Sequence, residues 1–448
     1  MRPVRSERTG RISRLTTVVT GDPPAQARSI LTNSGSLTGA VIVTALLGLP
    51  YWSLAARAFS TEVVGFAAAL VAAMTLLGTL GMLGLGTLLA GEFARDEGDH
   101  RGHLVPALVL AAFAGAALGI AFGIAAPRRL GLEQLGGKPG SIAIFATGAG
   151  LTSLSLVLDQ ALIGLQRGGL QLARNVLFAV AKLALVAIAA TGALTLGGVG
   201  LYATWVAGLV LSLLWVAVPL HRRRTGVRAR RLAASLWTVI CEWRTKAVKH
   251  HLVNIALRVG PLAMPLVAAG TVSVAGAAYY YTGALITNVL GYGAVAITFA
   301  LYTAGARHDG EFPRMLRFTL RMSFAVVIAA NVVLLVGAPV ILSVFGPSYV
   351  HNGATVMRLL GVSVLLMVVK DHYIAIARIR DWLTRAAVLC AAGAVLEIGL
   401  AAAGGLLAGL DGVALGRILA LLVQALVMSP AIIRELGWSL RTAPEVGS

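Results

Sequence analysis

The fold class is decided by residues 64–99, which read VGFAAALVAAMTLLGTLGMLGLGTLLAGEFARDEGD. No charged side chain occurs in this stretch before Glu92, so the apolar run is long enough to cross the roughly 30 Å hydrocarbon layer of a bilayer as a helix. The charged loop ARDEGD at 94–99 has a counterpart, ARHDGE, at 306–311. The sequence therefore predicts a membrane protein with an internal repeat.

Composition extends this interpretation to the whole chain. Hydrophobic residues make up 58% of the sequence and charged residues only 12%, whereas a soluble domain carries about 25% charged residues. The alternating ten-residue segments of a membrane barrel are absent, so every span is expected to be a helix. We predict an all-α polytopic membrane protein with twelve transmembrane helices, at approximately 37–58, 64–91, 104–126, 141–163, 171–192, 198–220, 250–270, 276–303, 318–342, 354–377, 384–408 and 412–433.

The basic residues indicate how the chain is oriented. If both termini are cytoplasmic, the inner segments hold 28 of the 37 Lys and Arg residues, the outer segments hold four and the spans hold five. This asymmetry is the positive-inside pattern of multi-pass proteins. The net charge of +19 is then a consequence of topology, and nucleic acid is not expected as a partner.

The repeat divides the chain into two similar halves. Pro50 and Pro261 are 211 positions apart, as are Gly65 and Gly276. Because each half contains six helices, the halves are expected to insert with the same orientation, as parallel repeats. The predicted order is a disordered basic cytoplasmic tail at 1–36, an N-terminal lobe at 37–220, a basic cytoplasmic linker at 221–249, a C-terminal lobe at 250–435 and a cytoplasmic tail at 436–448.

Charged residues inside the predicted spans are the candidates for function, because each costs roughly 2.5–3.5 kcal/mol at the bilayer centre on insertion scales. Five basic residues against three acidic ones favour an anionic substrate. The prolines that bend the first helix of each half, Pro50 and Pro261, fit either hinges or static kinks. The basic residues are Lys182, Arg258, Arg358, Lys370 and Arg417, and the acidic ones are Asp159, Asp371 and Glu397.

Several segments resemble the polysaccharide flippases of the multidrug/oligosaccharidyl-lipid/polysaccharide superfamily. They are ARAFSTEVVGFAAAL at 56–70, LARNVLFAVAKLALV at 172–186, VFGPSYVHNGATVMRLLGVSVLL at 344–366 and GVALGRILALLVQALVMSP at 412–430. The resemblance implies a two-lobed, V-shaped, MATE-like bundle in a bacterial cytoplasmic membrane. It also implies export of undecaprenyl-pyrophosphate-linked oligosaccharide, for O-antigen or exopolysaccharide, with a polysaccharide polymerase and glycosyltransferases as further partners.

The basic candidates are read in this light as substrate-binding. Lys182 lies deep in its span, where it either lines the cavity or pairs with Asp159 or Glu397. Arg258 either meets the pyrophosphate or reaches towards the inner interface. Arg358 and Lys370 lie on one predicted helix, about 18 Å apart, and would form a two-step track for an anion if both face the cavity. Arg358 alone fits an interfacial residue whose side chain snorkels towards the head groups.

The acidic candidates are read as ion-coupling residues, for protons or sodium ions. A buried Glu397 would carry a proton if unpaired, and an ion pair with a basic residue is its alternative role. Asp371 directly follows Lys370. Asp159 is explained by capping near an interface and Arg417 by a structural role.

Two other functions fit parts of the sequence. A multidrug or cation antiporter of the same superfamily would have the same shape, with a more acidic and aromatic cavity. A membrane glycosyltransferase or polymerase would need carboxylates in a sizeable outer loop, and the longest outer loop, 127–140, has only Glu133. No catalytic residue, cofactor or metal site is therefore predicted.

Overall fold

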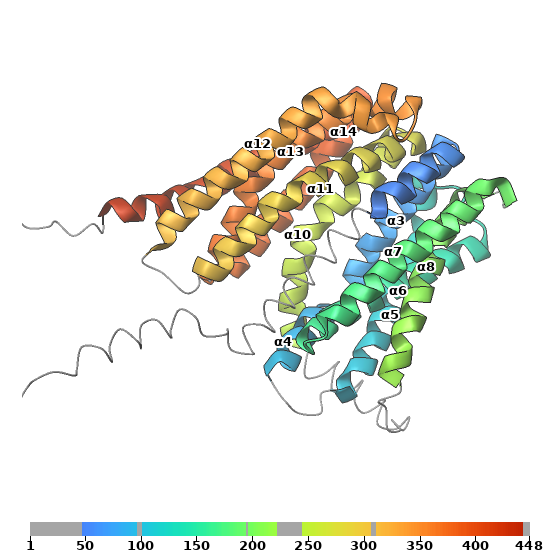
Figure 1. Ribbon diagram of the computed structural model, residues 1–448, viewed down its shortest axis with the longest axis horizontal. Coiled ribbons are helices and arrows are strands. Elements are labelled where there is room, and N and C mark those ends of the chain that lie inside the picture. The colour runs from blue at the N-terminus through green and yellow to red at the C-terminus, as the bar shows by residue number, and fades with distance from the viewer. Residues whose placement is uncertain (1–46, 96–100, 194–195, 222–243, 306–310, 442–448) are drawn as a thin grey trace, which may run out of the picture.

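The computed structural model describes residues 47–95, 101–193, 196–221, 244–305 and 311–441 (Figure 1). The predicted tail at 1–36, most of the predicted linker and most of both charged loops lie outside these ranges. Within them the chain is all helical, without a strand.

Each half of the sequence contributes a series of long helices. The first half has a helix at 47–58, followed by α3 (Thr61–Gly81), α4 (Leu85–Arg95), α5 (Arg101–Ala125), α6 (Pro139–Gly164), α7 (Gly168–Ile188) and α8 (Gly198–His221). The second half has α10 (Arg244–Thr271), α11 (Val274–Gly305), α12 (Phe312–Ser343), α13 (Pro347–Ile379) and α14 (Leu383–Arg441).

These helices confirm the polytopic membrane fold. Nine of the described helices are long and apolar enough to cross a bilayer. The longest, α14, covers two predicted spans, because Gly409 (φ 61°, ψ −145°) folds the chain between them in a conformation that glycine adopts easily. In α10 the apolar part is the shorter Ile255–Thr271, and only the end of the first predicted span, 47–58, is described.

One predicted span has a different form. Residues 64–91 were expected as a single helix, but α3 ends at Gly81 and α4 begins at Leu85. The turn between them places Leu83 (φ 50°) and Gly84 (φ 73°) in the left-handed region, which an α-helix cannot include. Composition does not reveal this break because the residues on both sides are apolar.

The helices form two lobes, one from each half of the chain. Helices α3 to α8 pack on one another, and so do α10 to α14; α3 bridges the lobes by packing on α10 and α11. Figure 1 shows the lobes meeting at the end of the bundle that holds the turns before α3 and α11 and separating away from it. We call this end the joined end; the predicted orientation makes it the outer one.

Close contacts hold the joined end together. A Cβ atom on Gly65 of α3 would overlap the carbonyl of Val274 of α11, so glycine is required for this approach. The ring centroids of Trp52 and Tyr281 are 4.8 Å apart. Ser53 Oγ and Arg57 Nε donate to the Val344 carbonyl at 2.9 and 2.7 Å; as the C-cap of α12, Val344 has a carbonyl without a helical partner. We call the Ser53–Arg57–Val344 contact the latch.

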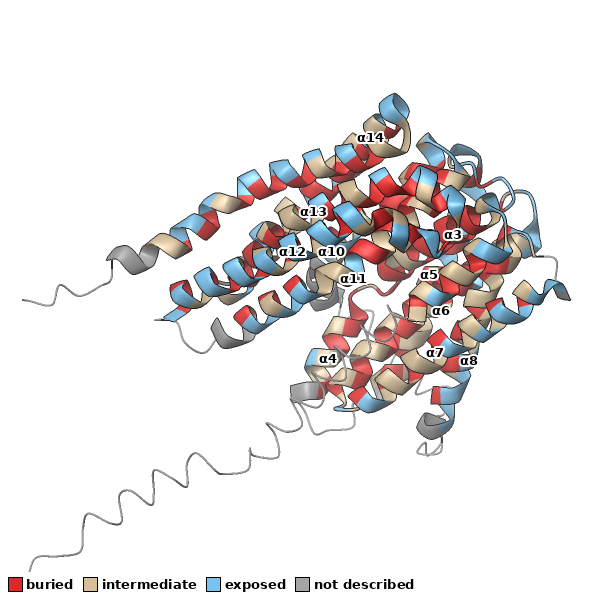
Figure 2. Ribbon diagram, turned by 45° about the horizontal axis from the view of Figure 1, so that its top comes forward, coloured by how far each residue is buried: buried red, intermediate tan, exposed pale blue. Residues whose placement is uncertain are grey.

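The distribution of burial fits a surrounding bilayer. Buried residues lie where helices face one another, and exposed residues lie on the outer sides of the bundle (Figure 2). Large apolar side chains are prominent among the exposed ones, such as Val336 (80% exposed) and Leu407 (86%). Such surfaces are stable against lipid, since lipid tails are as apolar as the side chains.

Candidate functional site

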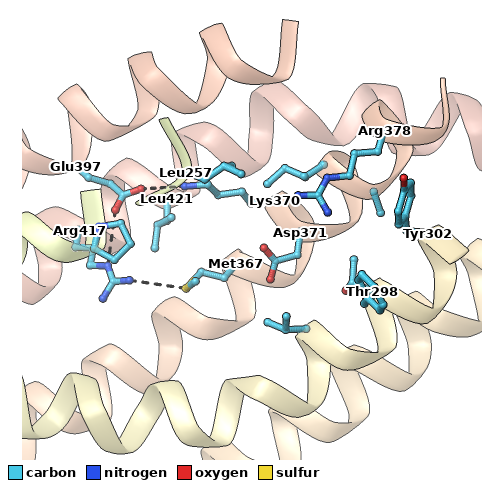
Figure 3. A pocket seen from close by; sticks show the side chains of 15 residues that line it. Leu257, Thr298, Tyr302, Met367, Lys370, Asp371, Arg378, Glu397, Arg417 and Leu421 are labelled. Atoms are coloured by element: carbon cyan, nitrogen blue, oxygen red, sulfur yellow. Dashed lines mark hydrogen bonds and ion pairs between the residues drawn. The ribbon is translucent and has the colours of Figure 1, made fainter. Parts of the chain in front are cut away.

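A cavity of about 200 Å³ lies between α10, α11, α13 and α14 in the C-terminal lobe. Its lining is mostly apolar and aromatic, with five charged side chains among it. Figure 3 shows Lys370, Glu397 and Arg417 grouped on one side, and Arg378 with Tyr302 on the other. The charged lining residues are Lys370, Asp371, Arg378, Glu397 and Arg417, three basic and two acidic, for a formal charge of +1.

One buried carboxylate holds two cations in this wall. Lys370 Nζ is 3.3 Å from Glu397 Oε1, and Arg417 Nε is 3.9 Å from Glu397 Oε2. Gln424 Nε2 also donates to Glu397 Oε1, at 3.0 Å, and Arg417 NH1 lies 3.5 Å from the Tyr280 hydroxyl. The structure thus brings two predicted site residues, Lys370 and Glu397, into contact. One negative charge cannot neutralise two positive ones, so the cluster keeps an excess positive charge.

Glycines make room for this cluster. A Cβ atom on Gly260 of α10 would be 2.8 Å from Glu397 Oε2, and one on Gly393 of α14 would overlap the Gln424 amide. The next residue, Pro261, lines the cavity. Because proline has no N–H, the carbonyl of Leu257, four residues earlier, lacks its helical hydrogen bond. The predicted hinge position therefore lies at the site, whereas Pro50 lies in the other lobe.

Asp371 presents a separate carboxylate to the cavity. Adjacent helical residues project about 100° apart, so Asp371 does not join the Lys370 cluster. Within the described residues, no basic group lies within 4.0 Å of its carboxylate. It also lines a second cavity, of about 100 Å³, with Asn288 and Tyr292 of α11.

Arg258 is exposed on α10. It does not line the cavity, although Leu257, its neighbour in the chain, does. Arg258 is therefore placed beside the site rather than in its wall.

Arg358 has a local partner at the lipid-facing side of the bundle. Its Nε donates to the carbonyl of Leu335 of α12 at 3.0 Å. That carbonyl lacks its helical partner because the residue four positions on is Pro339, which has no N–H. Arg358 does not line either of the two cavities described above, so Arg358 and Lys370 are not brought together.

The pairing of Arg358 with a proline-freed carbonyl can be tested by stability. We expect Arg358→Met to lower the free energy of unfolding by about 1–3 kcal/mol, the cost of leaving the Leu335 carbonyl unsatisfied in apolar surroundings. In a Pro339→Ala background the restored N–H can bond to Leu335, so the same change should cost less than half as much. Denaturant unfolding in detergent measures both, and an equal loss in the two backgrounds would contradict this role.

Lys182 is enclosed in the N-terminal lobe, with only 1% of its surface exposed. Its Nζ lies 3.5, 4.8 and 5.4 Å from the ring centroids of Trp205, Phe178 and Tyr51. We call these three rings the aromatic box. A Cβ atom on Gly208 would be 3.0 Å from the Lys182 Cβ, so this glycine lets α8 approach α7.

No carboxylate accompanies Lys182 among the described residues. Neither of its two predicted partners pairs with it, because Glu397 is held by Lys370 and Arg417, and Asp159 is held by Arg174. Burial of an ion costs several kcal/mol, and a desolvated cation–π contact contributes about 2 kcal/mol or more. The rings therefore offset a large part of the cost of a charged Lys182.

Sequence reasoning missed a second charged cluster. Arg174 is 2% exposed and donates to both carboxylate oxygens of Asp159, at 3.0 and 2.6 Å. It lies near the start of the span predicted at 171–192 and was counted with the basic residues of the inner segments, but α7 already begins at Gly168, so Arg174 lies within the helix. The tight turn at 165–167, where Gln166 has φ 56°, brings α6 and α7 together. The signal available in the sequence was the short distance between the two residues, 15 positions.

No protein-family model and no curated protein matches this chain. Solved structures do match it. One is an inward-facing multidrug resistance MATE family transporter of the MOP superfamily, with TM-score 0.67 and 17% identity over 90% of this chain and 99% of that one. Another is the lipid II flippase MurJ in an inward closed conformation, with TM-score 0.69 and 14% identity over 90% of each chain.

A third match is a MOP superfamily transporter from Pyrococcus furiosus, described by a reverse polarity of its binding pocket. Its TM-score is 0.57 and its identity 17%, over 95% of this chain and 98% of that one. Identities this low establish the fold alone. The chain thus has a fold similar to that of these two transporters and of the lipid II flippase.

Proposed function

We propose that this protein is a flippase that moves undecaprenyl-pyrophosphate-linked oligosaccharide from the inner to the outer leaflet of a bacterial cytoplasmic membrane by alternating access. The observation that carries the proposal is the excess positive charge of the cavity wall, where Glu397 is shared between Lys370 and Arg417. An anionic head group would supply the missing negative charge. In a low-dielectric cavity such a charge-assisted contact is strong.

The rest of the cavity suits a lipid-linked substrate. Its remaining lining is largely apolar, including Val295 and Phe299, which are about half exposed and could contact the carrier chain. Arg378 stands at the other side of the cavity, over the Tyr302 ring at 5.7 Å. With Lys370 and Arg417 on one side and Arg378 on the other, the cavity offers basic groups at more than one position for a pyrophosphate.

Asp371 is assigned the ion-coupling role in this proposal. Its carboxylate faces two cavities and has no basic partner within 4.0 Å in the described part of the chain. A proton or a sodium ion bound there would reduce the negative charge next to the head-group site. Coupling and cargo binding would then share one lobe.

A cation antiporter is the second candidate, and a specific observation favours it. The same unpaired Asp371 lies on a cavity wall that includes the rings of Phe299 and Tyr302, a combination that recognises lipophilic cations. In the flippase, the positive charge of the Lys370–Glu397–Arg417 cluster would bind an anionic head group. In the antiporter, the negative charge of Asp371 would bind a cation.

Binding by the purified protein in detergent distinguishes them. We expect undecaprenyl pyrophosphate to bind wild type, and Lys370→Met to weaken this binding at least about tenfold, or 1.4 kcal/mol, because the Glu397–Arg417 pair that remains is neutral. Lys138→Met, which removes an exposed charge outside the cavity, should leave affinity unchanged.

The opposite pattern would support the antiporter. Unchanged pyrophosphate affinity in Lys370→Met, together with tetraphenylphosphonium binding that Asp371→Asn abolishes, would contradict the flippase proposal. The test compares two probes on one protein, so a loss of folding would affect both and be recognised.

A further inference from the structure

The aromatic box around Lys182 has no part in the cavity of the C-terminal lobe. It lies in the other lobe, and the cavities described above do not reach it. Yet a buried amine among three aromatic rings, without a carboxylate, is an expensive arrangement for a structural contact alone. A leucine or methionine would fill the same space without a charge to desolvate.

Among the described residues, the side chains that face Lys182 include no carboxylate and no second base. Tyr51 comes from the helix at 47–58, and its hydroxyl is bonded to Thr204 Oγ1 at 3.0 Å and lies 3.3 Å from the Leu201 carbonyl. Trp205 comes from α8, and Phe178 precedes Lys182 on α7. Tyr202 of α8 is directed to the Phe145 carbonyl instead.

The nearest ion pair that involves the same helix is too far from Lys182 to neutralise it. Arg174 precedes Lys182 by eight residues, or about 12 Å of helix, and is bound to Asp159. On the helix at 47–58 the one charged residue is Arg57, which is exposed and bonded to α12. Neither the Arg174–Asp159 pair nor Arg57 supplies a counter-charge to Lys182.

The helix at 47–58 connects the aromatic box to the closure of the joined end. Tyr51 forms one wall of the box, and the next residue, Trp52, contacts Tyr281 of the other lobe. About one and a half turns further along, the latch bonds Arg57 to the C-terminal end of α12. A change that moves this short helix away from α7 and α8 therefore acts on every one of these interlobe contacts.

We propose that Lys182 binds and releases a proton, and that its charge state sets whether the joined end is closed. The ammonium is attracted to the faces of Trp205, Phe178 and Tyr51 and so holds the helix at 47–58 in the position that the latch needs. Loss of the proton to water leaves a neutral amine and the attraction ends. Tyr51 is then held to α8 only by its hydrogen bond to Thr204 and its edge contact with Trp205, so the helix at 47–58 leaves more easily. Uptake of a proton from water reverses the step.

This inference goes beyond the proposed function because it concerns the conformational cycle and not the cargo. It applies to a flippase and to an antiporter alike. Its sign is fixed: the charged form predominates at low pH and favours a closed joined end, whereas the neutral form at high pH favours an open one.

The test measures the conformation directly, without any substrate. Spin labels on Lys138→Cys and Ser348→Cys, two exposed positions on different lobes near the joined end, report its opening by pulsed electron resonance in nanodiscs. Cys390→Ala and Cys241→Ser remove the native cysteines. The ratio of long to short distances is recorded from about pH 5 to about pH 9. This range lies above the usual pKa values of carboxylates and below that of tyrosine.

Two variants of Lys182 give opposite expectations. In wild type the ratio of open to closed molecules should rise at least about tenfold from the low-pH end of the range to the high-pH end. Lys182→Arg stays charged at every pH, so its joined end should remain closed throughout. Lys182→Met is never charged, so its open fraction should be high and independent of pH.

Specific results would overturn the proposal. A wild type whose distances do not change with pH excludes it, and so does a Lys182→Met variant that keeps the wild-type pH dependence. Thermal unfolding of each variant shows whether it is folded, and the arginine variant keeps the test valid if methionine is not tolerated. Because no cargo is present, failure here leaves the flippase proposal standing, and failure of pyrophosphate binding leaves this one standing.

Discussion

Replacing Glu397 by glutamine is expected to lower the free energy of unfolding by about 3–5 kcal/mol, the cost of breaking a buried ion pair by removing one partner. Glu397 is 1% exposed and is the shared counter-charge of Lys370 and Arg417. Glutamine fits the same space but leaves the two cations facing each other in a low-dielectric region. Denaturant unfolding in detergent measures the loss.

A second ion pair provides the matched control. Glu435 and Arg380 are 2.8 Å apart, and their side chains are 7% and 23% exposed. Glu435→Gln should cost less than Glu397→Gln, because it leaves one uncompensated cation instead of two and that cation is partly exposed. In addition, Lys370→Met should recover part of the stability lost in Glu397→Gln, because it removes one of the uncompensated charges. Equal losses in Glu397→Gln and Glu435→Gln would contradict the account of the cluster.

Replacing Gly65 by alanine is expected to open the joined end. The added methyl group would overlap the backbone carbonyl of Val274, and a backbone atom cannot move aside by changing a rotamer. Forced overpacking of this kind costs about 1–3 kcal/mol, and only the closed joined end has this contact. The spin-label distances between positions 138 and 348 should therefore shift towards the longer component.

The repeat supplies the control for this substitution. Gly276 occupies the corresponding place in the second half, but the nearest atom to an added Cβ there is Ser273 Oγ, at 3.3 Å. Gly276→Ala should leave the distance distribution close to that of wild type. If both alanine variants behaved alike, the Gly65 contact would not be what closes the joined end.

The membrane fold followed from the sequence because it depends on simple quantities. Apolar run length locates the helices, and composition alone excludes a soluble domain. The break at Leu83–Gly84 did not follow, since its flanks are as apolar as the helices themselves. The start of α7 at Gly168 was also missed, because span ends are less well defined than span centres.

The candidate site followed only in part. Lys370, Glu397 and Asp371 could be singled out because a charge within an apolar span needs a reason. Their partners depend on how each helix is rotated about its axis, which no local pattern fixes. Arg417 is 20 positions from Glu397, beyond the turn at Gly409. The partner of Arg358 is the Leu335 carbonyl, which is free only because of Pro339 in another helix. The aromatic box likewise combines residues from three helices.

The measurement that tests the central claim most directly is transfer of a lipid-linked oligosaccharide in proteoliposomes. Outer-leaflet accessibility of the sugar is followed for wild type, Lys370→Met and Lys138→Met, with a cationic dye as competing cargo. The account predicts sugar transfer by wild type and Lys138→Met, and a loss of at least about tenfold in a folded Lys370→Met variant. Dye movement without sugar transfer, or sugar transfer that Lys370→Met leaves unchanged, would contradict it.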